Sequence, residues 1–417
     1  MKNSPSVNFF KVLLLAALLL VLCVLSFFAL WPPEKPMHST GADSFPIRWS
    51  FTPGPDPLSG IALGPNGAVY FAAATGIYAL SPAGQLLWKT PLPSGPVVAA
   101  PTVAPDGTIY GGSRSGKLFA LDSSGSLIWE SVSTQHRLLT PPVFGNDGAL
   151  YVTDDYSNIF AFAPGRDANL HWKRTTYSNV PDSDGVLLGN NYPGYGSSFT
   201  SPVIGANDTI YLAHQSWLYQ ISASGEVAHY TQFYGGAPGF PAIGGDGTIY
   251  VGGYNSAAIA AIDGHGNALS GMPTSGHVKG SPVIDSAGII YFCDSGFAKA
   301  FTSDGRQKWS LLIPCNSGPA LAADGTLYVG SNGAFATKES HKFFLTAITS
   351  AGQVKSKIEI HGMVVDAPAI APDGTICFTT DQGYVYAVSD AGSPPMDSPW
   401  PRFQHDAQNS GRAKLSR

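Results

Sequence analysis

The sequence is poor in charged residues. Asp, Glu, Lys and Arg make up 12% of its 417 residues, whereas an ordinary soluble domain contains about 25%. The 23 Lys and Arg residues form no basic cluster, and the formal net charge is −5. Since nucleic-acid binding depends on Lys and Arg that neutralise phosphates, this composition argues against a nucleic-acid partner.

Cysteine is also scarce, and the four in the chain are Cys23, Cys293, Cys315 and Cys377. No two are adjacent, and none has the Cys-x-x-Cys or Cys/His spacing of a metal or haem site. Three lie beyond the N-terminal apolar run, and an odd number cannot all pair within the chain. Cys377 replaces the Tyr of the repeat described below, which predicts a buried thiol. Cys293 and Cys315 fall in adjacent repeats, and their pairing stays open.

The chain instead contains a repeat built on one turn. Its pattern is Pro, four residues, Asp-Gly and a short β-branched or aromatic strand that ends at Tyr, as in Pro101 to Tyr110. Asp-Gly between apolar runs predicts a β-hairpin, because Gly accepts the positive φ that the turn needs. The clearest copies carry Asp106-Gly107, Asp246-Gly247, Asp324-Gly325 and Asp373-Gly374, and looser copies begin at Ile61, Pro142, Pro202 and Pro282.

Each repeat predicts one propeller blade. Most of the eight copies lie about 40 residues apart, the period expected of blades, and each has room for four strands. The recurrent Asp residues are expected to bond their own backbone and set the turn. Small residues before the prolines, such as Gly280 and Gly318, predict crowding at the axis. The recurrent Trp residues, Trp49, Trp88, Trp129, Trp172 and Trp309, are expected to pack between neighbouring blades.

The two ends of the repeat array indicate how the ring closes. Residues 46–51 resemble a fourth strand with no blade ahead of it, whereas the last repeat stops before Pro394-Pro395. The first strand is therefore expected beside residues 384–389, which removes two exposed sheet edges. The predicted fold is all-β, an eight-bladed β-propeller of four-stranded antiparallel blades over 46–412, followed by a tail at 413–417.

The N-terminus is predicted to lie outside the propeller. Residues 12–31 are an uncharged apolar run of bilayer length and predict a transmembrane signal-anchor helix. Lys2 and Lys11 place the stub 1–11 in the cytoplasm, and 32–45 form a Pro-rich linker. This predicts a single-pass protein of the cytoplasmic (inner) membrane with an extracytoplasmic, periplasmic propeller. A cleaved signal peptide and a lipid anchor at Cys23 are the alternatives.

The repeats resemble the PQQ-type β-propeller repeat of the quinoprotein alcohol dehydrogenase-like superfamily. The segment Ala-x-Asp-x-x-Gly-x-x-x-Trp at 120–129 is similar to the tryptophan-docking motif of that family, one residue shorter. The run from Pro399 to Arg412 is similar to the tail of bacterial exported propellers of this kind. Eight blades, the length and the envelope address also resemble the BamB-type propeller of outer-membrane assembly. This resemblance implies a scaffold that binds an envelope protein.

The same resemblance implies a second function, a PQQ-dependent dehydrogenase. Its relatives hold PQQ and calcium on the axis, with an Asp base and a disulfide between adjacent cysteines. This chain has no adjacent cysteines, so no cofactor is expected, and PQQ with calcium belongs only to this alternative. Asp366, just before the Pro of the eighth repeat, is a weak candidate for the base. His136, His277 and His361 precede innermost strands of separate blades and are expected to be exposed rather than metal ligands.

Two insertions break the repeat, at 175–199 and 333–342. In an up-and-down meander both leave the same face, and Tyr- and Asn-rich loops on a rigid scaffold suit binding. The candidate binding-face residues are Tyr177, Asn190, Asn191, Tyr192, Tyr195, Phe199 and His341. The leading interpretation is a non-catalytic protein-interaction scaffold. Binding of polysaccharide or cell-wall glycan through the same aromatic loops is a third.

Overall fold

The computed structural model describes residues 46–413, except 55, 98, 157, 164–168, 176–199, 215, 234–238, 254–257, 316, 333–341 and 391–392. All of them belong to one compact unit, Asp43–Arg417. No described residue lies in a helix of the length and apolarity needed to cross a bilayer. The predicted stub 1–11, helix 12–31 and linker 32–45 are outside the described residues, as are 414–417.

The described strands form eight sheets of four antiparallel strands each, so the predicted propeller is confirmed. Blade 1 consists of β2 (Ile61–Leu63), β3 (Val69–Ala73), β4 (Gly76–Leu80) and β5 (Leu86–Thr90), and blade 2 of β6 (Thr102–Val103), β7 (Ile109–Gly112), β8 (Leu118–Leu121) and β9 (Leu127–Glu130). Blade 3 consists of β10 (Val143–Phe144), β11 (Leu150–Thr153), β12 (Asn158–Phe162) and β13 (Leu170–Thr175), and blade 4 of β14 (Val203–Ile204), β15 (Ile210–His214), β16 (Trp217–Ile221) and β17 (Val227–Gln232).

Blades 5 to 8 complete the ring. Blade 5 consists of β18 (Ala242–Ile243), β19 (Ile249–Val251), β20 (Ala258–Ile262) and β21 (Ala268–Pro273), and blade 6 of β22 (Lys279–Ile284), β23 (Ile290–Cys293), β24 (Phe297–Phe301) and β25 (Gln307–Leu312). Blade 7 consists of β26 (Ala320–Leu321), β27 (Leu327–Asn332), β28 (Phe343–Ile348) and β29 (Val354–Ile360), and blade 8 of β30 (Ala369–Ile370), β31 (Thr375–Thr379), β32 (Val385–Ser389) and β1 (Ile47–Phe51).

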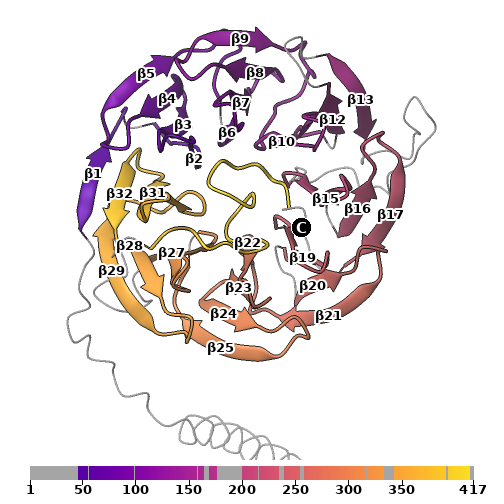
Figure 1. Cartoon of the computed structure of the whole chain (residues 1–417), viewed down its shortest axis with the longest axis vertical. Helices are drawn as coiled ribbons and strands as arrows, with labels where there is room; N and C mark the ends of the chain where they lie inside the picture. Colours follow the sequence, from indigo (N-terminus) through magenta and orange to yellow (C-terminus); the bar gives the residue numbers. More distant parts are fainter. Residues whose placement is uncertain are drawn as a thin grey trace, which may run out of the picture. The chain divides into compact units, whose positions relative to one another are not determined.

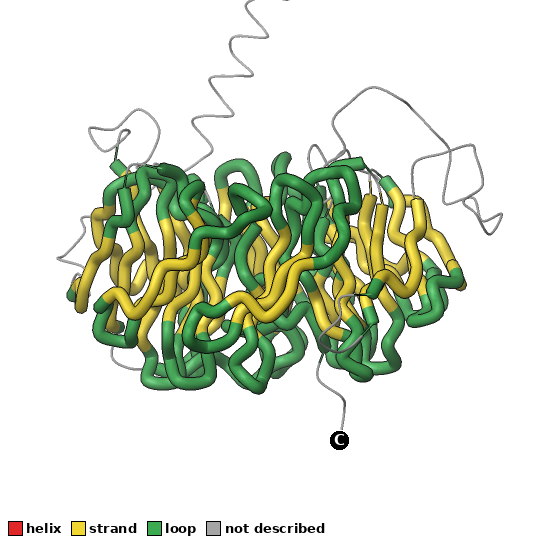
Figure 2. Tube along the Cα trace, turned by 90° about the horizontal axis from the view of Figure 1, so that it is seen from above, coloured by secondary structure: helices red, strands yellow, loops and turns green. Residues whose placement is uncertain are grey.

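The blades surround one axis, with the short first strands innermost (Figure 1) and the strands running between two faces (Figure 2). In blade 1 every residue of β2, β3 and β4 is buried, whereas β5 alternates between exposed and partly buried positions. The inner strands are apolar on both faces because each blade is covered by a neighbour on either side. The core is therefore a series of apolar layers between blades.

The ring is closed by the first strand, as the sequence predicted. β1 pairs antiparallel with β32, with Trp49 opposite Ala387 and Phe51 opposite Val385. Blade 8 thus combines three strands from the end of the chain with one from the start. β1 covers the edge of β32 that would otherwise be exposed where the ring closes, and it gives blade 8 the same four strands as the other blades.

The Asp-Gly turns have the geometry expected of them. Asp106 Oδ1 accepts a hydrogen bond from the Thr108 backbone N at 2.9 Å, and Gly107 has a φ of 86°. Asp246, Asp324 and Asp373 accept the same bond two residues on, and Gly247, Gly325 and Gly374 have φ values of 82°, 81° and 78°. These carboxylates hold turns, which explains why they recur.

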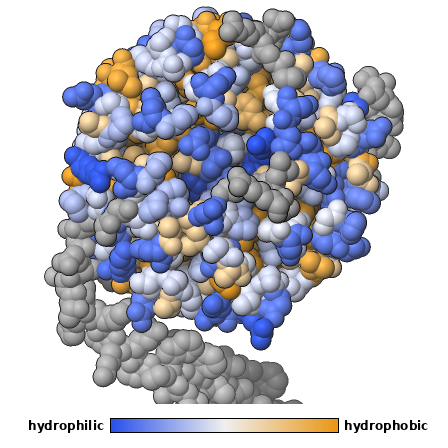
Figure 3. All heavy atoms as spheres, in the orientation of Figure 1, coloured by the Kyte–Doolittle hydropathy of each residue, from blue (hydrophilic) through white to orange (hydrophobic). Residues whose placement is uncertain are grey.

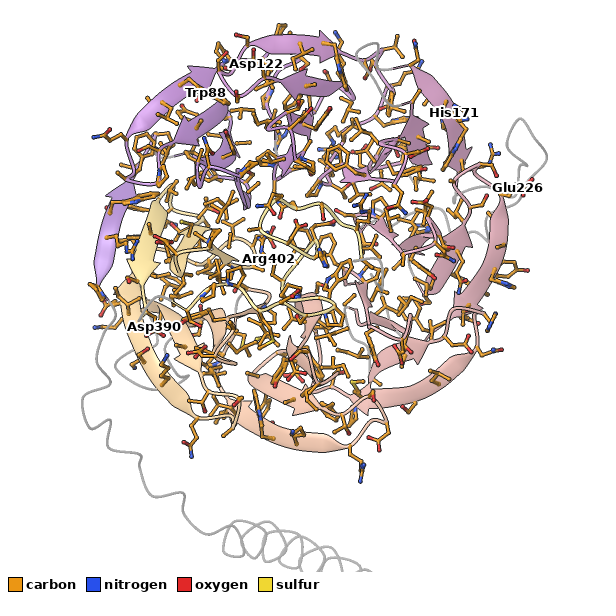
Figure 4. The ribbon with its side chains drawn as sticks, in the orientation of Figure 1. Trp88, Asp122, His171, Glu226, Asp390 and Arg402 are labelled. Atoms are coloured by element: carbon orange, nitrogen blue, oxygen red, sulfur yellow. The ribbon has the colours of Figure 1, made fainter. Side chains whose placement is uncertain are left out.

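The tryptophans of the outer strands contact the next blade. Trp88 Nε1 donates to Ser123 O at 3.0 Å, close to Asp122 in Figure 4. A Cβ on Gly125 would lie 2.5 Å from the Trp88 ring, so only glycine leaves room for the indole. The same arrangement joins Trp49 to Pro82 and Gly84, Trp172 to Ala223 and Gly225, and Trp309 to Ser350 and Gly352. Trp129 packs on Tyr110 of its own blade.

The starts of the inner strands crowd together near the axis, as predicted. A Cβ on Gly280 would lie 2.6 Å from the Gly318 Cα, and Gly280 has a φ of 67°. A Cβ on Gly318 would in turn be 3.5 Å from the Cβ of Ala367. Blades 6 and 7 therefore meet through backbone at this level, where a side chain on Gly280 does not fit, and the Ala367 methyl group of blade 8 packs beside them.

Candidate functional site

A C-terminal segment (residues 393–413) crosses the axis on one face of the ring (Figure 1). Its carbonyl groups accept hydrogen bonds from the last residues of six inner strands. The pairs are Leu63 N–Ala407 O (2.7 Å), Val103 N–Gln408 O (2.9 Å), Phe144 N–Ser410 O (3.4 Å), Ile204 N–Gly411 O (2.8 Å), Ile284 N–Trp400 O (2.7 Å) and Leu321 N–Pro401 O (2.9 Å). The segment therefore binds the ring through its backbone.

Arg402 brings a buried charge to this segment, near the centre of the ring in Figure 4. Its side chain is 3% exposed. Nε donates to Pro368 O at 3.1 Å and Nη2 to Ala367 O at 3.0 Å. Nη1 donates to Asp406 O and Asn409 Oδ1, both at 2.6 Å. One guanidinium thus links the backbone of blade 8 to two turns of the C-terminal segment.

Asn409 extends this link to blades 1 and 2. Its Nδ2 donates to Ile61 O at 3.1 Å and to Pro101 O at 2.9 Å, and its φ of 60° lies in the left-handed region that Asn tolerates. No role for Arg402 or Asn409 was predicted from the sequence. The sequence signal for a buried segment here is the pair of large aromatic residues Trp400 and Phe403 beyond the last strand, and the structure buries both.

Asp366, the weak candidate for a catalytic base, lies beside this network. Its Oδ1 accepts a hydrogen bond from Ala367 N at 2.8 Å. Its side chain packs so closely against Gly60 that a Cβ at that position would overlap the carboxylate. Burial raises the pKa of Asp366, and the positive charge of Arg402 opposes that rise. Among the described residues, Asp366 belongs to no group of three or more acidic, His or Cys side chains that could hold a metal ion.

A groove of about 600 Å³ opens beside blade 5. It lies between residues 397–399 of the C-terminal segment and Ala413, over the β18–β19 turn. Its polar lining groups include Asn207, Tyr211, His265, Ser286 and Asp397. Hydrophilic residues also surround the centre of the visible face in Figure 3. This groove was not anticipated from the sequence, because its two walls come from turns and from the C-terminal segment.

The predicted binding-face residues, Tyr177, Asn190, Asn191, Tyr192, Tyr195, Phe199 and His341, lie outside the described residues. The strands that flank the two insertions are described. β13 ends at Thr175 and β14 begins at Val203, while β27 ends at Asn332 and β28 begins at Phe343. In an antiparallel meander these strand ends lie on one face, and the C-terminal segment bonds to inner-strand ends on the opposite face.

The three loop histidines lie in separate blades and have local partners. His136 stacks on Tyr156 with ring centroids 4.2 Å apart. The His277 backbone N donates to Ser295 Oγ at 2.8 Å. His361 Nδ1 lies 3.0 Å from the Tyr386 hydroxyl. Within the described ranges these side chains are not part of any cluster that could hold a metal ion.

Comparisons with known proteins agree with the fold. The family model described as Outer membrane protein assembly factor BamB matches residues 73–216, whereas no curated protein matches the chain. Among solved structures, BamB from Moraxella catarrhalis is similar, with a TM-score of 0.64 and 16% identity over 83% of this chain and 100% of that one. The computationally designed Ika8 protein has a TM-score of 0.60 and 14% identity over 81% and 97%. The predicted PQQ-like propeller repeat is thereby confirmed.

Proposed function

We propose that this protein is a non-catalytic scaffold of a bacterial-type envelope, held at the inner membrane by residues 12–31, which binds a protein partner. The observation that carries the proposal is the occupied axis. The C-terminal segment bonds to the ends of six inner strands, and Arg402 bonds to the backbone just before β30, so the chain itself crosses the axis where a cofactor or substrate would bind. The match of residues 73–216 to the BamB assembly-factor family supports a role in the envelope.

The partner is proposed to bind the face opposite the C-terminal segment. The strand ends that flank 176–199 and 333–341 lie there, on β13, β14, β27 and β28. β13 and β14 belong to neighbouring blades and β27 and β28 to one blade, so both connections start and end on strands that are held in four-stranded sheets. Tyr192 and Tyr195 are the proposed anchors, because aromatic residues dominate the energy of protein interfaces.

Replacing Tyr192 and Tyr195 together by alanine is expected to weaken partner binding about tenfold, since aromatic anchors supply much of the interface energy. Crosslinking in the envelope and pull-down with the full chain measure this. Tyr230→Ala is the matched control, because Tyr230 is 63% exposed on the outer strand β17. If the wild type, the double variant and the Tyr230→Ala control recover protein partners and cell-wall glycan equally, Tyr192 and Tyr195 are not binding anchors. Selective loss of glycan would favour the glycan-binding alternative.

Titration of the protein with PQQ and calcium tests the enzyme alternative. We expect no saturable change in Trp fluorescence and no dye-linked alcohol oxidation, because Asp366 and Arg402 are engaged with the chain's own backbone. Saturable binding with turnover would overturn the scaffold proposal. In that event, loss of turnover in the Asp366→Asn variant would identify Asp366 as the base. Asp155→Asn is the control, because Asp155 forms an ion pair with Arg137.

A further inference from the structure

Cys293 and Cys315 lie side by side between blades 6 and 7. Their Sγ atoms are 2.6 Å apart, which is closer than unbonded sulfur atoms pack and about 0.5 Å longer than a disulfide bond. Cys293 is 0% exposed and Cys315 is 6% exposed. The remaining propeller cysteine, Cys377, is buried in blade 8 at the position of the repeat Tyr, as predicted.

The backbone on both sides of the pair is held by its own blade. Cys293 ends β23 and pairs with β24. Cys315 forms an antiparallel bridge with Ser331, and the Asn332 N donates to Pro314 O at 2.9 Å. The ladders of two separate blades therefore bring the sulfur atoms together.

The surroundings favour a bond between the two sulfurs over a metal site. Apolar side chains, including Ile313 and Val329, belong to the same cluster as both cysteines. Asp294, next to Cys293 in the chain, is paired with Lys299 Nζ at 2.8 Å. Across the residues that the structure describes, no third ligand group completes a metal-binding cluster.

We propose that Cys293 and Cys315 form a disulfide that ties blade 6 to blade 7 in the exported protein. The two thiols lose two protons and two electrons as one S–S bond forms. The electrons reduce the disulfide of a thiol oxidoreductase of the envelope to a dithiol. Such bonds persist in oxidising compartments outside the cytoplasm. The bond rests on export, one part of the proposed function, and is independent of any partner.

The disulfide supports the base of the β27–β28 hairpin. Ser331, which bridges to Cys315, is next to Asn332, the last residue of β27 before the 333–341 connection. Burial raises the pKa of Cys293, and the neighbouring Cys315 and Asp294 raise it further. Because the thiolate is the reactive species, the bond is expected to form while the chain folds and to exchange slowly afterwards.

Peptide mapping of the full-length protein tests the bond. Protein from the envelope is unfolded in iodoacetamide without reductant and digested with trypsin. Lys299, Arg306 and Lys308 separate the two cysteines, so a disulfide-linked peptide pair is expected, with Cys377 alkylated. Alkylated Cys293 and Cys315 in protein that external protease shows to be exported would overturn the disulfide while leaving export intact. Protein inaccessible to protease would instead contradict export.

A stability measurement checks the same bond without depending on peptide recovery. Dithiothreitol is expected to lower the melting temperature of the wild-type protein by about 5 °C, because opening a covalent loop frees the unfolded chain. The double variant Cys293→Ser, Cys315→Ser is expected to show no such shift, whereas Cys377→Ser keeps it. An equal effect of the reductant on wild type and double variant would contradict the disulfide.

Discussion

Replacing Arg402 by alanine is expected to lower the free energy of unfolding by about 3–5 kcal/mol, the range seen when one member of a buried charged network is removed. Its guanidinium donates to Pro368 O, Ala367 O, Asp406 O and Asn409 Oδ1. The alanine variant leaves these acceptors buried without their donor, and each such group carries a desolvation cost. Urea unfolding followed by Trp fluorescence measures the loss.

Two further variants separate the network from the charge alone. Arg402→Lys is expected to recover only part of the stability, because an ammonium cannot reach acceptors on opposite sides as the planar fork does. Arg114→Ala is the control, since Arg114 is exposed and such surface changes stay within about 0.5 kcal/mol. Equal midpoints for Arg402→Ala and Arg114→Ala would mean that the hydrogen bonds of Arg402 contribute little to the stability of the fold.

The ring could be predicted because its signals are local and repeated. Asp106 sets its turn through a bond to Thr108, two residues away, and Trp88 reaches a Gly one repeat ahead. The closure was also predictable, because residues 46–51 have strand character but no preceding partner. The turns and the Trp contacts depend on spacing within about one repeat, and the closure follows from the extra strand at the start of the array and the missing one at its end.

The crossing of the axis by the C-terminal segment could not be predicted in the same way. Asn409 bonds to Ile61, which is 348 positions earlier in the chain, and no periodic pattern connects them. The Cys293–Cys315 contact joins the end of β23 in blade 6 to the segment before β26 in blade 7, so spacing within one repeat left it open. Asp366 was placed near the axis from its position before a Pro, but its contact with Gly60 and the charge of Arg402 depend on the complete ring.

Deleting residues 46–51 from the otherwise unchanged chain is expected to have the largest effect on the ring. β1 supplies the ladder with β32, and Trp49 Nε1 bonds to Pro82 O of blade 1 at 2.8 Å. Net hydrogen-bond gains of about 1 kcal/mol each, together with the Trp contact, amount to about 5 kcal/mol. Because that is comparable to the whole stability of many domains, we expect loss of the cooperative unfolding transition and aggregation through the exposed β32 edge.

A synthetic peptide of residues 45–52 provides a direct test of this explanation. Added in excess to the deleted chain, it is expected to restore a cooperative transition, because β1 acts through pairing and requires no covalent connection to blade 1. A peptide with Trp49→Ala should restore less, whereas Arg48→Ala should restore nearly as much, since the Arg48–Asp373 ion pair is exposed and such pairs contribute little. If the deleted chain unfolds at the same urea concentration as the wild type without any peptide, blade 8 is stable with three strands, and the ring does not depend on β1 for its closure.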